Sequence, residues 1–157
     1  MRGKPEVIEV LAEMLKEELG AISQYILHAE MCENWGYKRL SGYIKKQAIG
    51  EMKHAERLVE RMLFLEGMPD MATLPKLHIG KTVPQQLEND LALELSAVAA
   101  YNDGILRCQK AGDHTSVELL RELLRDEEDH VDFIEAQLGI IKDVGVENYL
   151  PAQMEAK

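Results

Sequence analysis

The chain has 157 residues and a mass of 17.8 kDa, which fits one domain, residues 1–157, with a substantial core. Its hydrophobic fraction of 46% is too high for a disordered chain, and a formal net charge of −10 disfavours binding to nucleic acid or to anionic membranes. The same charge favours the binding of cations.

The N-terminal residues contain three glutamates, Glu6, Glu9 and Glu13, where an export signal requires an unbroken apolar run. No later segment approaches the run of about 18 apolar residues that a membrane-spanning helix needs. We therefore expect a cytoplasmic protein that makes no membrane contact. The two cysteines, Cys32 and Cys108, are too few for a disulfide framework or a four-cysteine metal site. We expect both to be small buried side chains that form no disulfide with each other.

Apolar residues at helical spacing predict a first helix from Pro5 to about Asn34, with Gly36 as its left-handed C-terminal cap. A second periodic stretch begins near Arg39 and ends before Gly67. The segment that follows is irregular and rich in proline, so we expect a long connection there.

Thr82 and Gln85 form a capping-box pattern that opens a third helix, which runs to about Ala111. Thr115 and Glu118 form a second such pattern and predict a fourth helix that reaches roughly Asp143. A short tail before Pro151 has room for one or two helical turns. The sequence thus predicts an all-α, ferritin-like four-helix bundle, with one long crossover between helices 2 and 3 and a short C-terminal fifth helix.

An internal repeat appears when the chain is compared with itself at an offset of 76 residues. Four positions near the start of each half are identical, namely Glu18 and Glu94, Leu19 and Leu95, Ala21 and Ala97, and Tyr25 and Tyr101. The same offset superposes Glu51-x-x-His54 on Glu127-x-x-His130. Matching apolar faces alone explain a repeat of helix pairs, but they do not require charged residues at equivalent positions.

Residues three apart lie on nearly the same face of a helix, so each Glu-x-x-His presents a carboxylate beside an imidazole. Each of these residues taken singly is best interpreted as a solvated helix residue, but six at matched spacing are not. Four carboxylates buried without partners would cost several kcal/mol per charge, whereas two divalent cations would balance them. Oxygen ligands with one imidazole per metal favour iron or manganese, and the pattern fits a di-iron carboxylate site. The expected metal ligands are Glu18, Glu51, His54, Glu94, Glu127 and His130.

The sequence resembles the bacterioferritin family over essentially its whole length. The stretches that carry this resemblance are NWGYKRL (34–40), EMKHAERLVERMLFLEG (51–67), DLALEL (90–95), LRDEEDH (124–130) and ENYL (147–150). The resemblance implies an enzyme, a ferroxidase that oxidises two Fe(II) ions with dioxygen or hydrogen peroxide. It implies Glu18 and Glu94 as terminal ligands, Glu51 and Glu127 as bridges, and one histidine on each metal. It also implies iron storage and detoxification, with ferric mineral held inside a homo-oligomeric shell of 24 subunits.

Met52 lies about 100° around the helix from Glu51, so it cannot share the metal-binding face. By itself such a methionine indicates packing or an interface. The resemblance implies that Met52 is an axial ligand of a haem shared between two subunits. Tyr25 is a candidate to hydrogen-bond the metal ligands, and an ordinary core tyrosine is an equally good interpretation.

Two positions depart from the family pattern, because Lys46 and Gly50 stand where some members have a histidine and an aspartate on the inner surface. Asn34 and Gly139 likewise lack the charge expected along one route of iron uptake. Lys46 and Gly50 favour a second hypothesis, a haem-carrying cage whose stable di-iron cofactor exchanges electrons and is not a route for iron. A ferredoxin-like protein is the expected reductant for iron release. Three further histidines, His28, His78 and His114, have no partner at ligand spacing and are interpreted as surface or structural residues.

Overall fold

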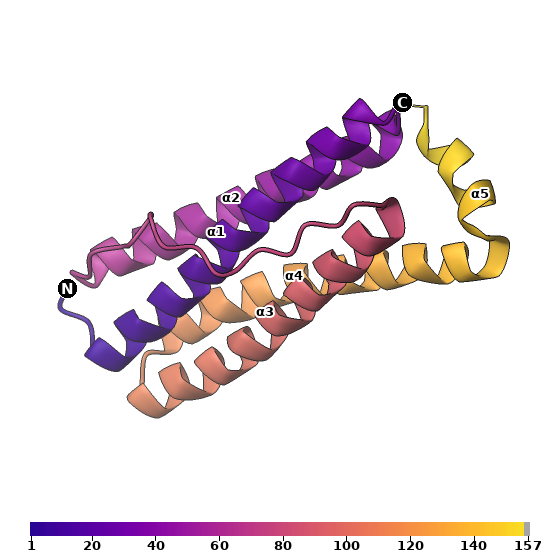
Figure 1. Ribbon diagram of the computed structural model, residues 1–157. Helices are drawn as coiled ribbons and strands as arrows, with labels where there is room; N and C mark the ends of the chain where they lie inside the picture. Colours follow the sequence, from indigo (N-terminus) through magenta and orange to yellow (C-terminus); the bar gives the residue numbers. More distant parts are fainter. Residues whose placement is uncertain (156–157) are drawn as a thin grey trace.

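Four long helices make up most of the protein, as a computed structural model describing residues 1–155 reveals (Figure 1). They are α1 (Pro5–Asn34), α2 (Lys38–Phe64), α3 (Val83–Ala111) and α4 (His114–Val144). A short α5 (Val146–Tyr149) and one 3₁₀ turn (Leu150–Gln153) follow. No strand occurs within residues 1–155. The predicted all-α bundle, with its long crossover and short fifth helix, is confirmed.

The helices form two hairpins, α1 with α2 and α3 with α4, which pack together mainly along α1 and α3. The crossover between α2 and α3 runs beside the helices from one end of the bundle to the other, so α1 and α3 are antiparallel (Figure 1). Cys32 and Cys108 lie near the C-terminal ends of these two helices. Both cysteines are buried and free, as the sequence predicts.

The core divides into two apolar clusters along the bundle. One contains the first half of α1 with residues such as Leu11, together with Leu58 of α2 and Leu120 of α4. The other contains the second half of α1, with Ala29, and Ile44 of α2. Each fully buried leucine contributes roughly 1.5–3 kcal/mol of transfer free energy. Between the two clusters, every long helix buries at least one acidic side chain, and there the metal centre was predicted.

Most helix ends follow the predicted signals. The Thr82 hydroxyl accepts a hydrogen bond from the Gln85 N–H at 3.3 Å, and Gly112 ends α3 with a φ of 80°. Gly36, just after α1, likewise has a positive φ of 90°.

The predicted cap of the fourth helix is wrong. Asp113, not Thr115, precedes the first turn of α4, and its carboxylate accepts a hydrogen bond from the Ser116 N–H at 3.0 Å. The Asp113 carboxylate also pairs with the Arg61 guanidinium of α2 at 2.8 Å. Aspartate caps at least as well as threonine, and this cross-helix partner fixes it in place. The helix therefore begins earlier than the capping-box pattern suggested.

A buried polar network holds the crossover against the bundle. The Asp90 carboxylate on α3 accepts hydrogen bonds from Gln24 (2.9 Å) and from His28 Nδ1 (2.8 Å) on α1. The His28 Nε2 atom accepts the Gly80 N–H at 3.0 Å, which leaves the ring proton on Nδ1. A Cβ atom at Gly80 would lie 2.3 Å from the backbone nitrogen of Gln86, so only glycine fits there. His28 is therefore a structural histidine, as predicted.

His78 and His114 are exposed, also as predicted. The tail differs in one detail, because Pro151 lies inside the 3₁₀ turn instead of after the helical turns. Proline is tolerated there because it lies in the first turn, where a backbone N–H needs no partner. No helix in the described part of the chain is both long enough and apolar enough to cross a membrane.

Candidate metal centre

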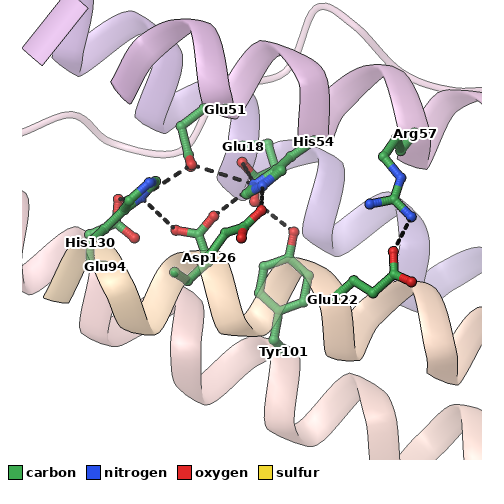
Figure 2. A network of polar contacts seen from close by, with 10 residues as sticks. Glu18, Glu51, His54, Arg57, Glu94, Tyr101, Glu122, Asp126 and His130 are labelled. Atoms are coloured by element: carbon green, nitrogen blue, oxygen red, sulfur yellow. Dashed lines mark hydrogen bonds and ion pairs between the residues drawn. The ribbon is translucent and has the colours of Figure 1, made fainter. Parts of the chain in front are cut away.

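All six predicted ligands meet in the middle of the bundle, between the two apolar clusters (Figure 2). Each hairpin supplies one glutamate from its first helix and one Glu-x-x-His from its second. The contributors are Glu18 from α1, Glu51 and His54 from α2, Glu94 from α3, and Glu127 and His130 from α4. The four glutamates and His54 are buried, and His130 is nearly so. The helical repeat therefore places six ligand side chains at one point of the core.

The side chains form two overlapping groups, and in each group the ligand atoms lie within 4.8 Å of one another. The first consists of Glu18, Glu51, His54 and Glu127, and the second of Glu51, Glu94, Glu127 and His130. Glu51 and Glu127 belong to both. Two metal ions held by these groups would therefore share two carboxylates, and these are the two that the resemblance implies as bridges.

Both imidazoles direct Nδ1 toward the carboxylates. His54 Nδ1 lies 2.9 Å from Glu127 Oε1 and 3.4 Å from Glu18 Oε2. His130 Nδ1 lies 3.4 Å from both Glu51 Oε1 and Glu94 Oε1. Nδ1 is thus the nitrogen of each ring that is available to a metal.

Burial and mutual repulsion disturb the ionisation of the cluster. Burial raises the pKa of Glu51 well above its ordinary value, and the nearby carboxylates of Glu18 and Glu127 raise it further. Burial also raises the pKa of Glu127, but the close approach of Glu94, His130 and His54 outweighs this effect and holds that pKa well below its ordinary value. Burial lowers the pKa of His54, but the hydrogen bond with Glu127 and the nearby Glu18 carboxylate raise that pKa to about 11. Protons thus partly replace cations in this cluster.

Several buried polar atoms of the cluster still have no hydrogen-bond partner within residues 1–155. Among the described residues, six buried side-chain atoms have no hydrogen-bond partner, and five of the six belong to the predicted ligands. These five are Glu18 Oε2, Glu51 Oε1, Glu94 Oε2, Glu127 Oε2 and His130 Nδ1. Buried polar atoms normally have partners, and leaving one without costs about 1–3 kcal/mol. The donor set therefore fits two divalent cations.

Two tyrosines extend the symmetry of the cluster. The Tyr25 hydroxyl donates to Glu94 Oε1, and the Tyr101 hydroxyl donates to Glu18 Oε1 at 2.6 Å. Each bond crosses from one hairpin to the other. Of the two interpretations of Tyr25, the structure favours the hydrogen bond to a predicted ligand. Tyr101 was not singled out from the sequence, although its identity with Tyr25 in the repeat was a usable signal.

Asp126 is a further residue that the sequence reasoning missed. Its carboxylate lies 2.8 Å from His54 Nε2, whereas Nδ1 of the same ring faces the glutamates; Figure 2 shows Asp126 beside His54. No spacing rule predicts this contact, because it depends on how α2 and α4 are rotated relative to each other.

Met52 lies away from the cluster, as its position on the helix predicts. Its side chain is 44% exposed, whereas the adjacent Glu51 is buried. Ile49, one turn earlier on α2, and Ile26 on α1 are also exposed. The thioether of Met52 is therefore available to a group outside the bundle.

Comparison with known proteins identifies a ferritin-like domain over residues 8–144. The chain is 44% identical over 149 residues to a bacterioferritin of Brucella melitensis, an alignment covering 95% of this chain and 92% of that protein. It is 40% identical over 149 residues to a bacterioferritin of Mycobacterium leprae, covering 95% and 94% respectively. A bacterial ferritin of Synechocystis is 40% identical over 155 residues, with 98% and 99% of the two chains covered.

Proposed function

This chain belongs to the bacterioferritin family, and we propose that it oxidises Fe(II) to Fe(III) at the six-residue cluster and stores the product as a ferric mineral. The observation that carries the proposal is the group of five buried, unpartnered ligand atoms between two apolar clusters. Such a set is unfavourable in the metal-free protein and is satisfied when cations bind.

Charge balance fits a pair of Fe(II) ions as the substrate. The four carboxylates supply four negative charges, which two divalent ions neutralise. Oxidation of the pair releases two electrons, which reduce dioxygen and two protons to hydrogen peroxide, or hydrogen peroxide and two protons to water. The resulting Fe(III) pair carries two further positive charges that these carboxylates do not balance. This excess favours transfer of iron from the site to the mineral.

The protein residues have distinct roles in this reaction. Glu51 and Glu127 lie in both ligand groups and serve as bridges that bring the two ions close enough to react with one oxidant. Glu18 and Glu94 each bind one ion, and their tyrosine partners, Tyr101 and Tyr25, fix their orientation. His54 and His130 each bind one ion through Nδ1. These roles follow from the two ligand groups and from the resemblance.

Storage requires an enclosed space, which a single bundle lacks. Family membership supports a homo-oligomeric cage, and we propose a shell of 24 subunits with the mineral inside. We also propose that the protein acts in the cytoplasm and that a ferredoxin-like protein supplies the electrons for iron release.

A haem is the second group that the family implies, and the residues fit it in one respect. Met52 offers an exposed thioether, a soft ligand suited to haem iron, on the same helix as exposed Ile49. One chain provides one such ligand, so we propose that Met52 of two subunits holds a shared haem. A haem bound there would supply one-electron redox chemistry at the outer side of α2.

The test is an anaerobic titration with Fe(II), followed by the addition of oxidant while absorbance and particle size are recorded. We expect a rapid phase of two Fe(II) per subunit and then slower growth of the mineral. Glu18→Ala and Glu127→Ala should each abolish the rapid phase and leave the assembly intact. Glu128→Ala removes an exposed glutamate next to Glu127 and should leave the rapid phase unchanged.

The outcome separates the two hypotheses about the site. Rapid oxidation followed by growth of the mineral supports storage. An oxidised iron pair that stays bound while no mineral forms would instead support a stable di-iron cofactor used for electron exchange. An unchanged rapid phase in both ligand variants would overturn the assignment of the site.

A further inference from the structure

The two histidines of the cluster differ on their outer sides. His54 Nε2 lies 2.8 Å from the Asp126 carboxylate. Among the residues that the structure describes, only Glu51, Glu94 and Glu127 form ion pairs with His130, and each pair is through Nδ1. The His54 side chain is 6% exposed and that of His130 is 14% exposed. The imidazoles thus have similar inner surroundings and different outer ones.

The internal repeat explains the difference. The offset of 76 residues that superposes Glu51 on Glu127 also superposes Gly50 on Asp126. Glycine has no side chain to approach His130, whereas Asp126 approaches His54. A Cβ atom built at Gly50 would have no neighbouring heavy atom within 4 Å, so the bundle leaves room for a side chain to start at this position.

An acceptor on the outer nitrogen matters for a ligand histidine. An imidazole that binds a metal through Nδ1 carries its proton on Nε2, and a carboxylate that accepts a hydrogen bond from this N–H fixes the tautomer and the orientation of the ring. It also makes Nδ1 a stronger donor to the metal. Loss of such an acceptor typically lowers metal affinity by roughly 10–100-fold. Asp126 provides this support to His54, and no residue among 1–155 provides it to His130.

We propose that Asp126 is a positioning residue for His54 and that its missing counterpart at Gly50 makes the two metal positions unequal. The position formed with Glu18 and His54 binds a divalent cation first and more tightly. The position formed with Glu94 and His130 binds second and releases its ion more readily. This inference rests on the proposed metal site and adds an order of filling to it.

The experiment titrates the full-length, metal-free assembly with Co(II) and follows binding by isothermal titration calorimetry. Co(II) is chosen because it resists oxidation by air. We expect two steps of one Co(II) per subunit each, with dissociation constants that differ by roughly 10–100-fold. His130→Ala should remove the weaker step and His54→Ala the tighter one, which assigns the steps to the two positions.

Two variants test the cause, each with a matched control. Asp126→Ala should weaken the tighter step by roughly 10-fold or more, so that the two steps converge. Asp129→Ala removes an exposed aspartate from the same helix and should leave both steps unchanged. Gly50→Asp should tighten the weaker step. Gly42→Asp makes the same change at an open position of α2 and should alter neither step.

The outcomes distinguish the failure of this inference from that of the proposed function. Equal affinities in the wild-type protein, or an unchanged tighter step in Asp126→Ala, would overturn the inequality and leave the metal site standing. An absence of stoichiometric Co(II) binding to the wild-type protein would overturn both. The metal-free unfolding midpoint of each variant shows whether the fold is preserved, and Gly50→Asp tests the cause even if Asp126→Ala unfolds.

Discussion

At the scale of single residues, the cluster is organised by hydrogen bonds that cross between the hairpins. Tyr101 of α3 donates to Glu18 of α1, and Tyr25 of α1 donates to Glu94 of α3. Burial and the nearby carboxylates raise the pKa of both hydroxyls well above the ordinary value, so both tyrosines stay protonated donors. Each glutamate is therefore held by a neutral donor that does not compete with a cation for charge.

Replacing Tyr101 with phenylalanine tests this role. The change leaves Glu18 Oε1 without its donor at a buried position, which costs about 1–3 kcal/mol. We expect a lower unfolding midpoint for the metal-free protein and weaker Fe(II) binding in an anaerobic titration. Tyr43→Phe is the control, because that ring stacks on Phe133 and its hydroxyl has no partner among the described residues. Equal effects of the two variants would refute the role of the Tyr101 hydroxyl.

Met52 provides an independent test at the same scale. Met52→Leu removes the proposed axial ligand and should abolish the haem absorbance of the purified protein. Because Met52 lies away from the cluster, the variant should retain the rapid oxidation of two Fe(II) per subunit. Absorbance spectroscopy and the iron titration measure the two properties separately. Haem that stays bound with unchanged axial ligation would exclude Met52 as its ligand.

At the scale of elements, the start of α4 depends on contacts that reach beyond the helix. Asp113 accepts hydrogen bonds from the Ser116 N–H and hydroxyl, and it pairs with Arg61 of α2. Burial raises the pKa of Asp113, but these bonds outweigh burial and hold it below its ordinary value. The cap thus links the second hairpin to the first.

The lowered pKa of Asp113 fixes the sign of a pH effect. A carboxyl group whose folded-state pKa is depressed stabilises the fold above its unfolded pKa of about 4 and loses this contribution as the pH falls through the folded value. We expect Asp113→Ala to lower the free energy of unfolding by about 1–2 kcal/mol at pH 7 and by less below pH 4. Chemical denaturation at both pH values measures this, with Asp129→Ala as the control. A loss of the same size at both pH values would contradict the link to ionisation.

At the scale of the whole molecule, a single bundle leaves many large apolar side chains at its surface. Among them are Leu63 and Phe64 at the end of α2, Met68 in the crossover, and Leu106 on α3. Exposed apolar side chains that lie together commonly mark an interface between proteins, and Leu63 and Phe64 are neighbours in the chain. Such a surface agrees with the homo-oligomeric cage that family membership supports.

The number of subunits can be measured directly. We expect a particle with a mass of about 24 times the 17.8 kDa of one chain. We also expect the protein shell to keep that mass after it has been loaded with iron and the iron has been removed. Light scattering measures the mass of the metal-free protein and of the protein whose iron has been loaded and then removed by reduction. A monomer or dimer at micromolar concentration would exclude an enclosed store.

The sequence by itself determined the four helices, the crossover and the six residues of the candidate site. It did so because helical periodicity and the 76-residue repeat are properties of spacing along the chain, and helix geometry converts spacing into a shared face. For that reason the Glu-x-x-His pairs could be recognised from the sequence.

Only the tertiary structure decided which side chains support these six residues. The hydrogen bond of Tyr101 to Glu18, the contact of Asp126 with His54 and the pairing of Asp113 with Arg61 all join different helices. Such contacts depend on how far each helix is rotated and shifted against its neighbour, which the packing of the whole core sets and no local spacing encodes. For the same reason, the repeat makes the two halves of the site look equivalent, whereas within residues 1–155 His54 has an outer carboxylate partner and His130 has none.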